Sequence, residues 1–262
     1  MAENSGSVAP QGYAEGVPCW VDAQLPDVAA GRRFYGGLFG WSFEERADGS
    51  GLWARLDGEP VAGLAHKTDG RMPTVWTVYF ATPDVAALGR RIRDAGGQLV
   101  SAPLGTGRLG TGALAADPEG AVFGLWQAGG HQGFGLRKAP GTFAWAELYA
   151  RDTEAADAFY GGLFSDALFG PGAEPEVGRA AVTELFTEGM PPHFLVHFAV
   201  PDCAAGLEKV TRLGGRVQAE PFVTSYGTVG VVTDDQGASF ALLERVTERA
   251  TAAHGPAHGP PI

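Results

Sequence analysis

The hexapeptide FYGGLF occupies residues 34–39 and recurs unchanged at residues 159–164, 125 positions further along the chain. Two further pairs follow in the same order: VYFATPD (78–84) with VHFAVPD (196–202), and DPEGAVF (117–123) with DDQGASF (234–240). Segments that repeat in order at an offset near half the chain length indicate a tandem duplication. The 262 residues suit two domains that each bury a core.

Each half divides once more into two similar units. Residues 20–25 alternate like a strand, Pro26-Asp27 supplies a turn and a helix cap, and residues 28–38 have helical spacing. The same order returns in residues 75–95. A single β-α-β-β-β module leaves one apolar sheet face exposed, so two modules should pair. The sequence therefore predicts an α+β protein in which four β-α-β-β-β modules pair into two tandem domains with curved, cup-shaped mixed sheets.

The predicted domain boundaries follow from the repeats and from glycine-rich stretches. We expect the N-terminal domain at residues 14–128, a linker at 129–140 and the C-terminal domain at 141–246. Residues 1–13 and 247–262 have the composition of disordered ends.

Composition and charge exclude several classes of partner. A formal net charge of -11, with no basic cluster beyond Arg90, Arg91 and Arg93, argues against nucleic acid. No apolar run has the length of a membrane span, and the start of the chain lacks a basic and apolar leader, so we expect a cytoplasmic protein without a membrane partner. Two cysteines at unmatched positions do not form a disulfide framework. The sequence leaves a monomer and a homodimer equally open.

The strand-turn-helix segments at residues 25–35 and 152–160, together with the Asp-x-x-Gly turns at Asp117 and Asp234, resemble a known superfamily. This is the vicinal oxygen chelate superfamily of glyoxalases, bleomycin-resistance proteins and extradiol dioxygenases, and the resemblance covers about Val17 to Val246. Residues 20–22, 124–127 and 145–148 are similar to a narrower group, the two-domain glyoxalase-like proteins of actinobacteria, which includes accessory proteins of antibiotic pathways.

In the metal-using members of the superfamily that this chain resembles, His and Glu side chains hold an ion in each cup. The corresponding positions here are Trp20, Thr77 and Gly124 in the first cup and Trp145, Leu195 and Ala241 in the second. None of these is a good ligand for a hard divalent ion. A non-standard site built on Glu147 and His197, with His193 as a further candidate, would need a third inward ligand that the sequence does not identify. We therefore expect no metal and no cofactor.

Strand alternation identifies the other side chains on the faces of these vacated positions. The predicted ligand-binding residues are Trp20, Asp22, Gln24, Thr77, Tyr79 and Trp126 in the first cup, and Trp145, Glu147, Tyr149 and His197 in the second. Small Gly124 and Ala241 should leave room for a guest. The rings suit a flat, partly apolar ligand, although rings on inner faces also fill cores. Asp22 and Glu147 are the sharpest candidates, because a carboxylate between apolar neighbours is costly unless it is paired, solvated or binding something.

Two functions remain open at this point. The first is metal-independent binding, for sequestration or resistance, of an aromatic or apolar small molecule resembling a natural product. The second is a cofactor-free or accessory enzyme of aromatic polyketide metabolism, with Glu147 and His197 as an acid-base pair. The chain has no Gly-x-Ser-x-Gly elbow and no Walker-type phosphate loop, which argues against nucleophilic and nucleotide hydrolysis.

Overall fold

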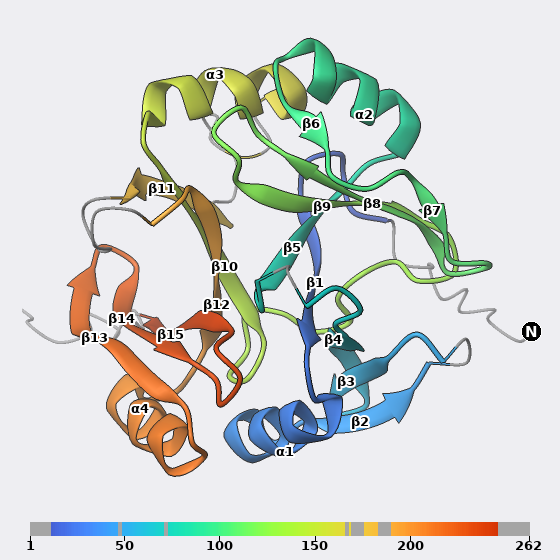
Figure 1. Cartoon of the computed structure of the whole chain (residues 1–262). Helices are drawn as coiled ribbons and strands as arrows, with labels where there is room; N and C mark the ends of the chain where they lie inside the picture. The colour runs from blue at the N-terminus through green and yellow to red at the C-terminus, as the bar shows by residue number, and fades with distance from the viewer. Residues whose placement is uncertain are drawn as a thin grey trace, which may run out of the picture.

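The computed structural model describes residues 12–46, 49–70, 73–165, 168, 176–182 and 190–245. In this part of the chain, two mixed sheets carry four helices on their outer faces (Figure 1). The predicted α+β class with two tandem curved sheets is confirmed. None of the helices in these ranges is long and apolar enough to span a bilayer.

The first sheet joins the first two modules. Its strand order is β2-β3-β4-β1-β5-β9-β8-β6, with β7 beside β8. The two modules meet where β1 pairs antiparallel with β5. The strands are β1 (Pro18–Leu25), β2 (Ser42–Glu45), β3 (Leu52–Leu56), β4 (Glu59–His66), β5 (Trp76–Ala81), β6 (Gln98–Leu99), β7 (Leu104–Gly105), β8 (Gly110–Ala116) and β9 (Val122–Ala128).

The second sheet repeats this arrangement in the order β11-β10-β12-β15-β14-β13. Here β10 and β12 form the antiparallel pair that joins two modules. In the third module the structure shows β10 and β11, while residues 183–189 lie outside the described ranges. The strands are β10 (Phe143–Ala150), β11 (Val177–Ala181), β12 (His193–Ala199), β13 (Arg216–Thr224), β14 (Gly227–Thr233) and β15 (Ser239–Arg245).

Each module has one helix that begins after a capping aspartate. The helices are α1 (Val28–Phe39), α2 (Val85–Asp94), α3 (Thr153–Phe164) and α4 (Cys203–Arg212). The carboxylates of Asp27, Asp84, Asp152 and Asp202 each accept a backbone N–H of the first turn, which satisfies donors that the helix itself leaves free. The helices predicted after Asp27 and Asp84 are therefore confirmed.

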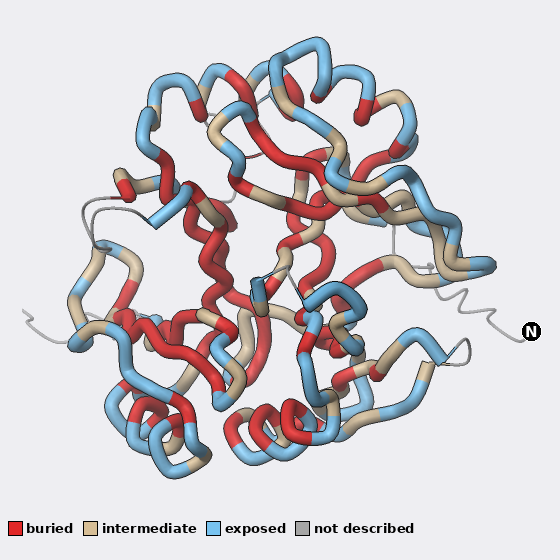
Figure 2. Tube along the Cα trace, in the orientation of Figure 1, coloured by how far each residue is buried: buried red, intermediate tan, exposed pale blue. Residues whose placement is uncertain are grey.

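The repeated FYGGLF segments pack each half against the other. In α1, the hydroxyl of Tyr35 donates to Asp234 Oδ2 at 2.9 Å, and in α3 the hydroxyl of Tyr160 donates to Asp117 Oδ2 at 3.1 Å. Helix α1 thus lies beside α4 of the other half, and α2 lies beside α3 (Figure 1). A continuous apolar core runs through both halves, and the buried trace in Figure 2 follows it across the centre of the molecule.

Residues 129–140, the predicted linker, pack against the first sheet. Phe134 is only 7% exposed, and its ring stacks on Phe143 with centroids 5.0 Å apart. Its backbone N–H donates to Cys19, and the hydroxyl of Tyr13 donates to its carbonyl. The ring of Tyr13 also packs edge-on against Phe134, with the ring centroids 6.5 Å apart. Residues 1–11 and 246–262 lie outside the described ranges.

Candidate functional site

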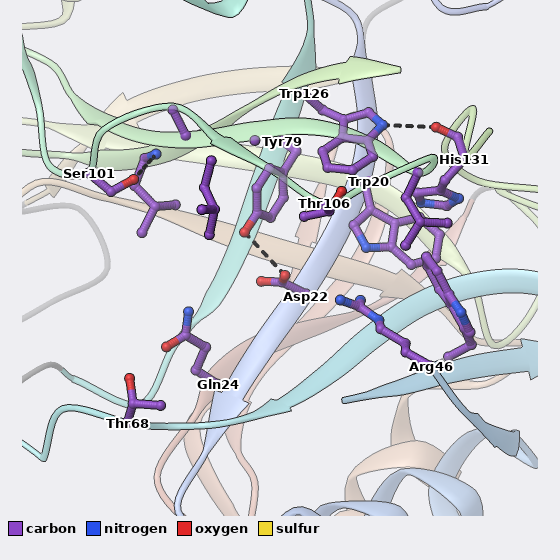
Figure 3. A pocket seen from close by; sticks show the side chains of 16 residues that line it. Trp20, Asp22, Gln24, Arg46, Thr68, Tyr79, Ser101, Thr106, Trp126 and His131 are labelled. Atoms are coloured by element: carbon purple, nitrogen blue, oxygen red, sulfur yellow. Dashed lines mark hydrogen bonds between the residues drawn. The ribbon is translucent and has the colours of Figure 1, made fainter. Parts of the chain in front are cut away.

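A cavity of about 460 Å³ opens in the curve of the first sheet (Figure 3). Most of the first-cup prediction agrees with its lining, which includes Trp20, Asp22, Gln24, Tyr79 and Trp126. Thr77 was predicted with them, but it is not among the lining residues and pairs with Asp22 across β1 and β5. Strand alternation thus brings five of the six predicted side chains to one cavity, while their role in binding stays a prediction.

Three lining residues that the sequence did not indicate complete one wall: Arg46, Trp53 and His131. The ring of His131 lies 4.4 Å from Trp20 and 4.5 Å from Trp53, measured between centroids. The indole N–H of Trp126 donates to the His131 carbonyl at 2.9 Å. Because His131 belongs to the packed linker, the connection between the halves forms part of the cup.

Asp22 is the acidic group of this cavity. The hydroxyl of Tyr79 donates to its Oδ2 at 3.1 Å, whereas Oδ1 is buried and has no hydrogen-bond partner within the described residues. Burial raises the pKa of Asp22 from 3.8 to about 6, against the opposing effects of the Arg46 charge and the Tyr79 hydrogen bond. Burial and the adjacent carboxylate hold the pKa of Tyr79 well above its ordinary value, so Tyr79 remains a donor.

Arg46 supplies positive charge opposite Asp22. Its guanidinium carbon lies 4.4 Å from the centroid of the Trp53 ring, within cation-π distance. Figure 3 shows the guanidinium end pointing toward the Asp22 carboxylate. Gly63, which pairs with Asp22 in the sheet, makes this approach possible because a Cβ there would collide with Arg46. The Nε atom of Arg46 is buried without a partner among the described residues.

His131 is the third polar group with an unmatched atom. Its Nε2 is buried and lacks a hydrogen-bond partner in the part of the chain that the structure describes. Burial, followed by the charges of Arg46 and Arg55, lowers the pKa of His131 from 6.5 to about 4. The imidazole is therefore neutral at pH 7, and the cavity presents a neutral ring beside three tryptophans.

The positions expected to hold a metal do not fit one. Trp20, Thr77 and Gly124 lie on β1, β5 and β9, which are neighbours in the sheet. Trp20 offers an indole, Thr77 a hydroxyl and Gly124 no side chain, whereas a hard divalent ion needs carboxylate and imidazole ligands. In the described ranges, no three or more His, Cys, Asp and Glu side chains are grouped as a metal site.

Gly124 does not leave room for a guest, which corrects the expectation from the sequence. It pairs with Tyr79 across β5 and β9, and a Cβ at this position would overlap the Tyr79 ring. The protein's own tyrosine thus fills the space from which a ligating Glu would extend. The same ring directs its hydroxyl to Asp22.

The second cup differs from the first. A cavity of about 520 Å³ is lined by Glu147 and Tyr149 from the prediction, together with Tyr226 and Phe222. Trp145 and Ala241 are buried in the apolar cluster that also holds Tyr149, but neither of them is among the residues that line this cavity. The Trp145 indole N–H donates to Glu147 Oε2 at 2.6 Å, and the Tyr226 hydroxyl reaches the same oxygen at 3.2 Å.

His197 lies deep beside this cup and not on its wall. It is 1% exposed, its Nδ1 is 3.1 Å from the Leu195 carbonyl, and burial lowers its pKa to about 4. In the strand register His197 faces Trp145, while Glu147 faces Leu195. The predicted acid-base pair of Glu147 and His197 stays a prediction, and the contacts described for Glu147 come from Trp145 and Tyr226.

The family profile and the curated relatives that match this chain include glyoxalase-like proteins and an antibiotic biosynthesis protein. The profile of the glyoxalase-like domain family matches residues 20–126. The chain is 36% identical over 265 residues to the anthracycline biosynthesis protein DauV of Streptomyces sp. (strain C5), covering 88% of this chain and 94% of DauV. It is also 36% identical over 250 residues to CFP32 of Mycobacterium bovis, which carries a glyoxylase name, covering 88% of this chain and 96% of CFP32.

A solved structure agrees with this at the level of the fold. The Mn(II)-bound glyoxalase of Novosphingobium aromaticivorans superimposes with a TM-score of 0.59, at 18% identity, over 88% of this chain and 84% of the other. An identity this low shows a shared fold alone. The metal of that enzyme is therefore not carried over to this chain.

Proposed function

The chain belongs to the glyoxalase, or vicinal oxygen chelate, superfamily, and we propose that its first cup binds a flat aromatic small molecule without a metal ion. The observation that carries this proposal is the combination of aromatic walls and unmatched polar atoms in one cavity. Trp20, Trp53 and Trp126 line this cavity, and Asp22 and Arg46 each have a buried polar atom without a partner among the described residues.

The size and surface of the cavity support a ligand of a few fused rings. Its volume of about 460 Å³ falls within the range of small-molecule pockets, about 300–1,000 Å³. Aromatic pairs contribute about 0.5–1.5 kcal/mol beyond the area they bury. A planar guest would therefore gain from the tryptophans, and the polar groups would set its orientation.

The relatives support a role in secondary metabolism. DauV is named an anthracycline biosynthesis protein, and this chain matches it over nearly its whole length. From this similarity we infer that the ligand is an aromatic natural product or its precursor, which the protein binds for sequestration, resistance or delivery.

The second candidate is a cofactor-free enzyme that acts on the same guest. The specific observation in its favour is Asp22, a buried carboxylate on the cavity wall whose pKa of about 6 suits a general base near neutral pH. In this case the acid-base group would be Asp22 in the first cup, in place of the predicted pair of Glu147 and His197 in the second.

Quenching of intrinsic tryptophan fluorescence by a panel of two- to four-ring planar aromatic compounds tests the proposal. We expect saturable quenching, because three tryptophans line the cavity. Trp53→Phe should weaken the affinity by up to about 5-fold, because an aromatic or cation-π partner contributes about 1 kcal/mol and Phe keeps only a smaller ring. Trp76→Phe is the control, because Trp76 is buried in the core away from the cavity and donates to Tyr35.

Mass spectrometry of the recovered compound separates the two candidates. An unchanged mass supports binding, and a new product mass supports the enzyme. The proposal is wrong if no compound in the panel quenches saturably, or if Trp53→Phe and Trp76→Phe change the affinity equally.

A further inference from the structure

Three buried polar atoms that lack hydrogen-bond partners among the described residues belong to side chains that line the first cup. Asp22 Oδ1, Arg46 Nε and His131 Nε2 are all buried without hydrogen-bond partners among the described residues, and all three side chains line the same cavity. A buried polar atom without a partner destabilises the folded protein, and the cost is larger when the group is charged. Three such costs in one cavity indicate that something supplies the missing partners.

The chemistry of each atom specifies what it lacks. A carboxylate oxygen can only accept, so Asp22 Oδ1 needs a donor. A guanidinium can only donate, so Arg46 Nε needs an acceptor. The two groups face each other in Figure 3, yet no N–O approach within 4.0 Å joins them among the described ion pairs, so they do not satisfy each other.

The neighbours of Asp22 hold this arrangement in place. Tyr79 already donates to Oδ2, which orients the carboxylate and leaves Oδ1 as the remaining acceptor. Trp53 stacks under the Arg46 guanidinium, and Gly63 leaves space for it beside Asp22. These contacts hold the carboxylate and the guanidinium next to each other on the cavity wall.

Building on the proposed function, we infer that the guest of the first cup is a planar aromatic compound that carries both a phenolic or enolic hydroxyl and a carbonyl oxygen. The hydroxyl donates to Asp22 Oδ1, and the carbonyl oxygen accepts from Arg46. His131 Nε2 offers a further polar contact from a neutral ring. An aromatic hydrocarbon of the same shape would leave all three atoms unmatched.

Binding of a matched ligand series tests this inference. The probes are 7-hydroxyflavone, 7-methoxyflavone and unsubstituted flavone, which share a planar frame and a ring carbonyl and differ in the donor. A hydrogen bond to a charged group contributes about 1.5–3 kcal/mol, so we expect the hydroxyl compound to bind about 10-fold to 100-fold more tightly than the methoxy compound. Isothermal titration calorimetry at pH 7.5 measures the three dissociation constants.

Two variants test whether Asp22 causes the preference for the hydroxyl compound. Asp22→Asn should reduce the hydroxyl preference to about 3-fold or less, because the amide keeps the size of the side chain and loses its charge. Glu208→Gln removes a carboxylate from the exposed face of α4, where Glu208 contacts Arg212, and should keep the full preference. Circular dichroism of each variant checks that it is folded.

The outcomes separate this inference from the proposed function. If all three flavones bind saturably with equal affinity, the cup binds aromatics and the hydroxyl inference is wrong. If the preference persists in Asp22→Asn, Asp22 is not the acceptor and the inference is equally overturned. If none of the flavones and no compound of the wider panel binds, the proposed function itself fails.

Discussion

Asp22 is a buried cavity-lining residue whose charge opposes folding. Its carboxylate lies among aromatic rings, with one oxygen held by Tyr79 and the other without a donor among the described residues. Arg46 offsets part of the cost of burial but does not remove it, since the pKa of Asp22 is still raised. Residues that stay costly in the folded protein are typical of binding and catalytic sites.

Asp22→Asn should therefore stabilise the protein at neutral pH. The pKa of Asp22 is raised from 3.8 to about 6 on folding, so the folded state holds this proton more tightly and ionisation destabilises the fold above pH 6. At roughly 1.4 kcal/mol per pKa unit, the gain in free energy of unfolding is at most about 3 kcal/mol at pH 7.5. It should shrink as the pH falls through 6 and vanish below 4.

Urea unfolding of both proteins at pH 7.5, 6.0 and 4.5 measures this dependence. Glu208→Gln, which changes an exposed carboxylate, is the matched control and should show no such pH-dependent gain. Equal or lower stability of Asp22→Asn at pH 7.5 would show that Asp22 is already well stabilised in the fold.

At the scale of elements, each repeated helix is held by the opposite half of the chain. The aspartates that begin the Asp-x-x-Gly turns have two tasks in the structure. Asp234 Oδ1 accepts the backbone N–H groups of Gln236 and Ala238, while its Oδ2 accepts the hydroxyl of Tyr35. Asp117 does the same for its own turn and for Tyr160. The tyrosine of each FYGGLF segment thus bonds to the aspartate of the Asp-x-x-Gly turn in the other half, and this contact occurs twice.

Tyr35→Phe should destabilise the protein by about 2 kcal/mol, because the hydroxyl also accepts from the Trp76 indole and both partners are buried. Tyr13→Phe is the control, since its half-buried hydroxyl bonds a single described carbonyl and its loss should cost about 1 kcal/mol or less. Chemical denaturation measures both changes. A smaller effect of Tyr35→Phe than of Tyr13→Phe would contradict the role assigned to the interface between the halves.

At the scale of the whole molecule, the two halves share one core. The apolar cluster includes Phe34 and Phe80 from the first half and Phe198 and Phe240 from the second. Phe39 and Trp41 of the first half lie with ring centroids 5.0 Å and 5.6 Å from Phe198. Separating the halves would expose these rings to water, at roughly 25 cal/mol for each Å² of apolar surface.

We therefore predict that the chain unfolds in a single cooperative transition. Differential scanning calorimetry should show one peak whose calorimetric and van't Hoff enthalpies agree. Two resolved peaks, or a first half (residues 12–128) that folds and remains soluble alone, would show instead that the halves are independent domains.

Much of the first cup could be predicted from the sequence, and particular residues show why the rest could not. Trp20, Asp22 and Gln24 share a face because side chains alternate along β1, and Tyr79 follows the same rule on β5. Arg46, Trp53 and His131 were missed. Arg46 and His131 lie outside the strands, where no periodicity places a side chain, and long-range backbone bonds hold the His131 segment against the sheet.

The sequence by itself determined the duplication, the pairing of modules into curved sheets and the inner faces of the central strands, because these depend on repeats and on the two-residue period of a strand. The tertiary structure decided which space is open and which polar groups meet. The Tyr79 ring closes the space at Gly124, and Gly63 admits Arg46 beside Asp22. Such outcomes depend on how side chains from neighbouring strands pack, and local sequence does not encode that packing.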